Sequence, residues 1–178
     1  MKAFIIGLIF GVLLVFGGVY FYFASGSAPV ATDAEAMPFE KKFAHMALNE
    51  RVKKEMPKSV PYQANEASFL GGAEVYRQDC AVCHGLPAQP ATAVAKGMFP
   101  KPPVLLEGKG VTDDPAEETY WKVANGIRMT GMPAFKRTLS DEQMWQVSLL
   151  LANADKIPQS VKDKLAVSTP EVPAVPHP

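Results

Sequence analysis

The sequence predicts an all-α protein in which one compact domain follows an N-terminal transmembrane helix. Three observations support this fold class. A long apolar run opens the chain, several later segments repeat apolar residues at helical spacing, and helix-capping or helix-ending residues flank those segments. With 178 residues, the chain has room for a single domain of ordinary size and an extension at each end.

Residues 3–24 contain no charged side chain. About 20 apolar residues suffice to cross the hydrocarbon core of a bilayer, whereas the apolar part of a secretory signal is usually shorter. We therefore expect residues 3–24 to contact membrane lipid as an uncleaved, single-pass anchor, with cleavage among the small residues 24–28 as the alternative. Lys2 before the span, and Asp33 and Glu35 after it, place the bulk of the chain outside the cytoplasm.

Residues 25–62 form a predicted tether between the anchor and the domain. Small and polar residues open the tether, and apolar residues then recur among charged ones over residues 33–55, which predicts an amphipathic helix. Its expected apolar face consists of Met37, Phe39, Phe43, Met46, Ala47 and Val52. We expect this face to pack on the domain or on a partner subunit. A position on the membrane surface is the alternative, which is less favoured because Glu40, Glu50 and Glu55 dilute the basic side chains.

The domain itself is predicted to span residues 63–158. Residues 68–79 have helical character and lead into a cysteine motif, and the Pro-, Ala- and Gly-rich stretch after that motif is expected to be an irregular loop. Thr112 or Asp113, together with Pro115, is predicted to begin another helix, which ends at Gly126.

The last predicted helix begins at a capping-box sequence, S-x-x-Q, formed by Ser140 and Gln143, and reaches about Asp155. Residues 159–178 follow as a Pro-rich tail. The prolines from residue 168 onward predict an extended or disordered chain.

Residues 80–84 read Cys-Ala-Val-Cys-His, the C-x-x-C-H attachment sequence of c-type haem. In this interpretation, the thiols of Cys80 and Cys83 bond one haem, and His84 ligates its iron. A structural disulfide does not account for the adjacent histidine, and a thioredoxin-like pair requires a preceding strand. A zinc site requires about four ligands, and only two remote histidines remain outside the motif.

A haem with histidine on one face has a second protein ligand, water or an open site on the other. A methionine thioether suits an electron carrier, and Met98, Met129 and Met132 are the candidates within the predicted loops. Met132 is preferred because Gly131 allows close approach to the ring and Pro133 restrains the backbone. Met129 and then Met98 are the alternatives.

Residues 71–157 resemble class I cytochromes c, particularly the membrane-anchored bacterial branch that is similar to subunits of cbb3 oxidases. The matching features are Gly72-Ala-Glu-Val-Tyr76, C-x-x-C-H-G, Pro102-Pro103-Val104-Leu105, Gly126-Ile127, Gly131-Met132-Pro133-Ala134-Phe135 and the last helix. One departure is Val104, which stands where the family commonly has an acidic residue.

The resemblance implies a cytochrome c fold around one haem c, bound covalently through Cys80 and Cys83. It implies that the metal is the haem iron and that its ligands are His84 and Met132. It also implies that the Pro103 carbonyl accepts a hydrogen bond from the ligating histidine, which fixes the orientation of its ring.

In the family, the first and last helices cross near a small residue and an aromatic residue, which correspond to Gly72 and Tyr76 against the helix bearing Trp145. A further set of side chains is expected to wall the haem or its supporting core: Tyr76, Leu105, Trp121 and Phe135. Burial in such a pocket, together with methionine ligation, is expected to raise the redox potential.

The sequence therefore predicts a one-electron carrier of a respiratory or other electron-transfer chain, without enzymatic activity of its own. The resemblance implies a location at the bacterial inner membrane with the haem domain on the periplasmic side, and redox proteins or a respiratory complex as partners. A net charge of zero and the lack of a basic block argue against a nucleic-acid partner. The alternatives are an integral electron-transfer subunit of a larger oxidase, reductase or dehydrogenase, and a haem enzyme or gas sensor with a displaceable distal ligand.

Overall fold

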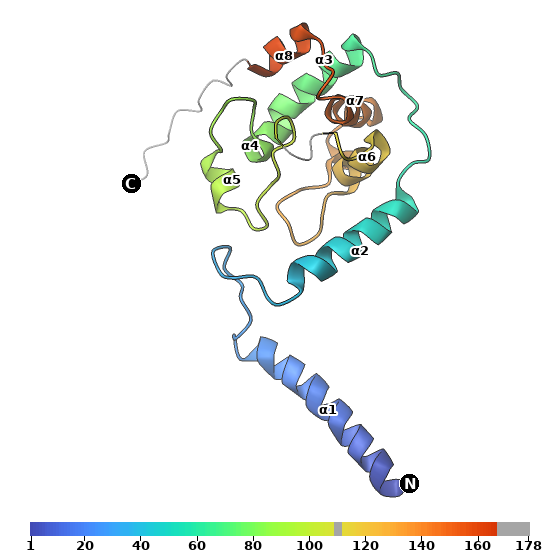
Figure 1. The fold of residues 1–178 in the computed structure, drawn as a ribbon, viewed down its shortest axis with the longest axis vertical. Coiled ribbons are helices and arrows are strands. Elements are labelled where there is room, and N and C mark those ends of the chain that lie inside the picture. The colour runs from blue at the N-terminus through green and yellow to red at the C-terminus, as the bar shows by residue number, and fades with distance from the viewer. Residues whose placement is uncertain (109–111, 167–178) are drawn as a thin grey trace. The chain divides into compact units, whose positions relative to one another are not determined.

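The computed structural model describes residues 1–108 and 112–166, and every regular element in these residues is a helix (Figure 1). The predicted all-α class is confirmed. The chain divides into two compact units, Met1–Ala44 and His45–Pro178. The predicted Pro-rich stretch from residue 168 onward lies outside the described residues.

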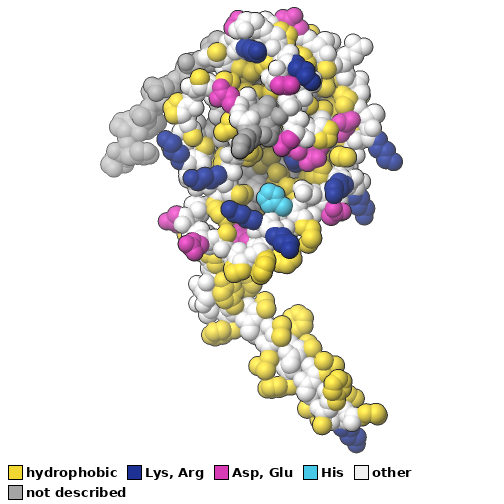
Figure 2. Space-filling view, in the orientation of Figure 1, with side chains coloured by type: hydrophobic (Ala, Val, Ile, Leu, Met, Phe, Trp, Pro, Cys, Tyr) yellow, Lys and Arg dark blue, Asp and Glu magenta, His cyan; other side chains and the backbone are white. Residues whose placement is uncertain are grey.

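The first unit is dominated by α1 (Lys2–Ala24), a helix of 23 residues. None of its side chains is buried, and its surface is apolar along its length (Figure 2). In length and composition α1 is able to cross a membrane, although a signal sequence near the N-terminus has the same properties.

The second helix, α2 (Glu40–Glu55), begins at Glu40 and not near residue 33, so the predicted start was wrong. Phe39 has a φ of 64°, which lies outside the helical region. The Glu40 side chain accepts a hydrogen bond from the Met37 N–H at 2.8 Å, so the backbone turns immediately before the helix. Pro38 lies within this turn and has no N–H to donate.

The single apolar face predicted for α2 was also wrong. At about 100° per residue, Val52 lies on the side of the helix opposite to Phe43. Val52 is 1% exposed, whereas Phe43 is 58% exposed. Leu48 and Met56 are half-buried and share the side of Val52, so α2 has one packed face and a different, exposed apolar face.

In the second unit, α3 (Glu66–Val75), η1 (Tyr76–Cys80) and α4 (Ala81–His84) follow one another without a break. Asn65 caps α3 by accepting a hydrogen bond from the Ser68 N–H at 2.9 Å. The η1 segment is a π-helical turn, in which the Ala81 N–H donates to the Tyr76 carbonyl. The predicted helix leading into the cysteine motif is confirmed, and it contains this unpredicted turn.

The loop after the motif contains the short helix α5 (Ala93–Gly97), and α6 (Ala116–Asn125) follows. Pro115 directly precedes α6, as predicted, but Pro115 itself and not Thr112 or Asp113 is the N-cap residue, and it makes no side-chain capping bond. Gly126 ends α6 with a φ of 65°, as predicted.

The helix α7 (Asp141–Ala152) begins with the predicted capping box. Ser140 Oγ accepts from the Gln143 N–H at 3.2 Å, and Gln143 Oε1 accepts from the Ser140 N–H at 2.9 Å. The helix ends at Ala152, before the predicted Asp155.

A last helix, α8 (Gln159–Ala166), corrects the predicted domain boundary at residue 158. Val161 and Leu165 are fully buried, and α8 packs on α3. Lys164 of α8 also forms an ion pair with Glu74 of α3, with Nζ 2.8 Å from Oε2. Residues 159–166 therefore belong to the folded domain and not to a tail.

The core forms where α7 packs against α3 on one side and α6 on the other (Figure 1). A Cβ atom at Gly72 of α3 would collide with the Gln146 carbonyl oxygen and lie 3.0 Å from Leu150 Cβ. On the other side, the rings of Tyr120 and Trp145 stack with centroids 4.2 Å apart. The helix crossing that the resemblance implies is therefore present, and it depends on backbone contact at Gly72.

Candidate haem-binding site

The cysteine motif lies where η1 passes into α4. Cys80 is the last residue of η1, and Cys83 and His84 are the last residues of α4. Burial raises the pKa of the Cys80 thiol to about 12, and Asp79 and Cys83 add to this effect, so Cys80 is protonated at neutral pH. Cys80 and Cys83 are not joined in a disulfide, and a buried thiol of raised pKa differs from the activated thiolate of a thioredoxin-like pair.

The imidazole of His84 is held by a backbone carbonyl. Its Nδ1 atom lies 2.8 Å from the Pro103 oxygen, and because a carbonyl can only accept, Nδ1 carries the proton and Nε2 keeps a lone pair. Burial lowers the pKa of His84, against an opposing effect of the Pro103 hydrogen bond. A neutral imidazole whose second nitrogen is fixed in this way is the form that ligates a metal ion.

Tyr76 supports the motif from within the core. The side chain is fully buried, and its hydroxyl donates to the Gly85 carbonyl at 2.9 Å. Burial raises the pKa of Tyr76, so the hydroxyl remains a donor throughout the ordinary pH range. Gly85 ends α4 with a φ of 78°, a conformation that favours glycine. The hydrogen bond therefore links the start of η1 to the residue after His84.

Thr92 fixes the other side of the motif, and the sequence interpretation missed it. Its hydroxyl donates to the Val82 carbonyl at 2.6 Å and accepts from the Ala95 N–H at 3.1 Å. The same side chain thus caps α5 and joins it to Val82, one of the two residues between the cysteines. A threonine directly before an Ala-rich stretch is an N-cap signal that sequence reasoning can use.

Met132 lies in a loop closed by several hydrogen bonds. The Ile127 N–H donates to the Met132 carbonyl at 3.2 Å, and the Met132 N–H donates to Thr130 Oγ1 at 3.1 Å. A Cβ atom at Gly126 would lie 2.8 Å from the Met132 oxygen and 2.7 Å from the Ala134 nitrogen, so only glycine allows this approach. These contacts fix the backbone of Met132 within the loop.

The three methionine candidates differ in their surroundings. Met132 is half-buried and packs against the core. Met129 is 93% exposed, with a φ of 61°, so its side chain lies in solvent. Met98 is half-buried, and its methyl group occupies the space that a Cβ atom at Gly131 would need. Met132 is therefore less exposed than Met129, and Met98 lies against the loop that bears Met132.

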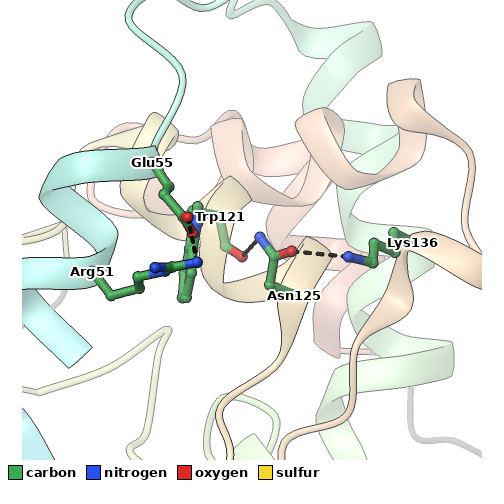
Figure 3. A network of polar contacts seen from close by, with 5 residues as sticks. All are labelled: Arg51, Glu55, Trp121, Asn125 and Lys136. Carbon is green, nitrogen blue, oxygen red and sulfur yellow. Dashed lines mark hydrogen bonds and ion pairs between the residues drawn. The ribbon is translucent and has the colours of Figure 1, made fainter. Parts of the chain in front are cut away.

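The side chains expected to wall the haem are not equivalent. Leu105 and Phe135 are half-buried and pack against the core. Trp121 of α6 is half-buried outside the core cluster, and its carbonyl accepts from Asn125 Nδ2 at 3.0 Å. Asn125 Oδ1 in turn accepts from Lys136 Nζ at 3.1 Å, which connects α6 to η2 (Phe135–Arg137) beyond the methionine loop (Figure 3).

Residues 67–149 match the family described as cytochrome c oxidase, cbb3-type, subunit III. This region is a class I c-type cytochrome domain. The cytochrome domain contains the C-x-x-C-H motif, the Pro103 carbonyl and the Met132 loop. The family match supports a role in electron transport and the binding of haem and iron.

No curated protein matches the chain. Among solved structures, a chain of the reducing HAO-like protein complex from Kuenenia stuttgartiensis is similar to it, with 22% identity and a TM-score of 0.46. This similarity covers 59% of the present chain and 54% of the other, so the chain spans about half the length of that protein.

The donors in the cytochrome domain fit a c-type haem, which when bound supplies an iron that gains and loses one electron. Two thiols are separated by two residues on one continuous helical segment, and an imidazole with a fixed tautomer follows directly. Within residues 1–108 and 112–166, no three His, Cys, Asp or Glu side chains form a group that would hold a metal ion. The cysteine and histidine donors of this motif therefore fit a c-type haem.

Proposed function

We propose that the cytochrome domain binds one haem c through Cys80 and Cys83, with His84 and Met132 as axial ligands, and acts as a one-electron carrier. The observation that carries this proposal is the contact between His84 Nδ1 and the Pro103 oxygen, at 2.8 Å, which leaves Nε2 as the ligating atom. A thioether on the opposite face raises the potential of the iron and suits electron transfer.

We also propose that α1 remains attached and anchors the chain in the bacterial inner membrane, with the cytochrome domain on the periplasmic side. Residues 3–24 of α1 carry no charge, which supports a spanning helix, and Lys2 at the first position of α1 with Asp33 after its end supports this orientation. Such an anchor raises the effective concentration of the cytochrome domain near membrane-bound redox partners.

The ligand assignment is tested on the full chain after haem attachment in a bacterial periplasm. The oxidised protein is expected to show the weak far-red charge-transfer band of an iron–methionine bond. Met132→Ala should abolish this band, and Met129→Ala, the matched control at an exposed position, should retain it. Met98→Ala should also retain it, and its loss in that variant alone would assign ligation to Met98.

The same samples test the number of haems and the open-site alternative. The intact mass should exceed that of the polypeptide by one haem, and replacing Cys80 and Cys83 should remove the covalent haem. The reduced parent protein should not bind carbon monoxide, because Met132 occupies the distal position. Carbon monoxide binding, together with a missing far-red band, would instead indicate a haem enzyme or gas sensor.

A second candidate function is that of an integral electron-transfer subunit, because the matched family is described as a subunit of a cbb3-type oxidase. Extraction in mild detergent followed by size-exclusion chromatography distinguishes the two functions. A free carrier should elute as a single chain in its micelle, whereas a subunit should elute with a larger assembly.

A further inference from the structure

The start of α2 exposes two aromatic side chains to solvent. Phe39 is 67% exposed and Phe43 is 58% exposed, with their ring centroids 6.3 Å apart. Met46, at 53% exposed, extends the same side of the helix by one turn. We call Phe39, Phe43 and Met46 the exposed apolar cluster.

The exposed apolar cluster is not the face by which α2 packs within its own chain. Val52 lies about 180° around the helix from Phe43 and is 1% exposed. Since the packing of α2 is already provided by the side that bears Val52, the cluster is available to a surface outside the folded domain.

The charged side chains nearest the cluster in the sequence are Lys41, Lys42 and Glu40, a small basic excess. The three glutamate side chains of α2 already have partners: Glu40 accepts from the Met37 N–H, Glu50 pairs with Lys53 at 3.0 Å, and Glu55 pairs with Arg51 at 2.6 Å (Figure 3). Within the part of the chain that the structure describes, Lys41 and Lys42 form no ion pair. Glu50 and Glu55 are thus balanced by Lys53 and Arg51 farther along α2, which leaves Lys41 and Lys42 with Glu40 at the end of the helix that bears the cluster.

The chain connectivity limits which surface the cluster can meet. The segment from Ala24 at the end of α1 to Phe39 can extend at most about 50 Å. With α1 in a bilayer, every molecule therefore carries the cluster within reach of a lipid surface. Phenylalanine beside lysine is also the composition that binds at the boundary between headgroups and acyl chains.

We propose that the exposed apolar cluster is a lipid-docking surface, which inserts shallowly into an anionic membrane while Lys41 and Lys42 contact the headgroups. This inference rests on the proposed membrane anchor. Docking would hold the start of α2 at the membrane. Only the chain that follows the cluster would then separate the cytochrome domain from the bilayer. The haem would then sample a narrower range of heights above the bilayer.

The test uses the haem-loaded full chain in nanodiscs of phosphatidylcholine, with or without phosphatidylglycerol. A spin label at Ala47→Cys lies beside the cluster and leaves its side chains intact, because Ala47 is exposed and one turn beyond Phe43. Labels at Gln89→Cys, in an exposed loop of the cytochrome domain, and at Leu14→Cys, within α1, are the controls. The quantity measured is the accessibility of each label to oxygen relative to a water-soluble nickel complex.

In discs that contain phosphatidylglycerol, the label at position 47 should be more accessible to oxygen than to nickel, and the label at Gln89→Cys should show the reverse. The combined change Phe39→Ser and Phe43→Ser should abolish the oxygen preference at position 47. Lys41→Gln with Lys42→Gln should weaken it only in the anionic discs. The four substituted side chains are all exposed, so these variants leave the folded core intact.

Two results would overturn the proposal. A nickel-accessible label at position 47, with an oxygen-accessible label at position 14, would show that the anchor inserts and the cluster stays in water. A label at position 47 shielded from both reagents would show contact with protein, which would indicate a partner subunit. The label at position 14 reports the anchor and the far-red band reports the haem ligation, so a failure of either earlier proposal is recognised separately.

Discussion

Gly72→Ala is expected to separate the two helices that form the main crossing of the cytochrome domain. A Cβ atom at Gly72 would collide with the Gln146 carbonyl oxygen and lie 3.0 Å from Leu150 Cβ. A backbone oxygen has no rotamer by which to move away, so α3 and α7 themselves must shift.

The size of the effect follows from two opposing contributions. Overpacking a core typically costs about 1–3 kcal/mol, and contact with backbone places Gly72→Ala at about 3 kcal/mol. Alanine is a better helix former than glycine by about 1 kcal/mol, which offsets part of this cost. The expected net decrease in the free energy of unfolding is about 2 kcal/mol.

Two other glycines provide matched controls. A Cβ atom at Gly71 would meet only the end of the flexible Gln146 side chain, so Gly71→Ala should cost less than about 1 kcal/mol. A Cβ atom at Gly97 meets no atom within 4 Å, so Gly97→Ala should lie within about 0.5 kcal/mol of the parent protein.

The assay is equilibrium unfolding of the haem-loaded full chain in detergent, followed by the visible haem absorbance as guanidinium is added. The expected order of destabilisation is Gly72→Ala, then Gly71→Ala, then Gly97→Ala. If Gly72→Ala were as stable as Gly97→Ala, the backbone contact between α3 and α7 would be refuted.

The same unfolding assay checks three further predictions. Tyr76→Phe removes the donor to the Gly85 carbonyl and should cost about 1–3 kcal/mol; an unchanged midpoint would contradict this contribution. Ser140→Ala removes the capping box of α7 and should cost about 1 kcal/mol, most of which Ser140→Asp should restore. The hydrogen bond with Lys164 lowers the pKa of Glu74 from 4.5. The stabilisation that the ionised Glu74 gives to the fold is therefore present above pH 4.5, and it is lost as the pH falls through the lowered pKa. Between neutral pH and about pH 3, Glu74→Gln should therefore lose less stability than the parent protein, and equal losses would argue against the pairing of α8 with α3.

The features that the sequence predicted well depend on short-range rules. The C-x-x-C-H motif, the Ser140 capping box and the helix end at Gly126 each involve residues that are adjacent or within one helical turn. The matching family region contains these features. Local geometry is enough to determine them, because few backbone conformations satisfy each pattern.

The errors came from features that need angular or long-range information. Counting about 100° per residue from Phe43 to Val52 already places them on opposite sides of α2, so that error was avoidable. The helix α8 has only Val161 and Leu165 as its buried pair, which is too short a pattern to recognise beside a Pro-rich tail. The packing of Met98 on Gly131 joins residues from two loops, and nothing in either loop alone indicates it.

The π-turn at η1 sets the direction in which Cys80, Cys83 and His84 face. A π-turn accommodates one residue more than the corresponding α-helical turn, and each added residue rotates the later part of the helix by about 100° around its axis. Removing one residue from Tyr76–Cys80 would restore a regular helix, yet it would turn Cys80, Cys83 and His84 away from the Pro103 carbonyl that holds the imidazole. The extra residue therefore rotates the later part of the helix about its axis. This rotation lets α3 keep its packing against α7 while the thiols and the imidazole face the loops.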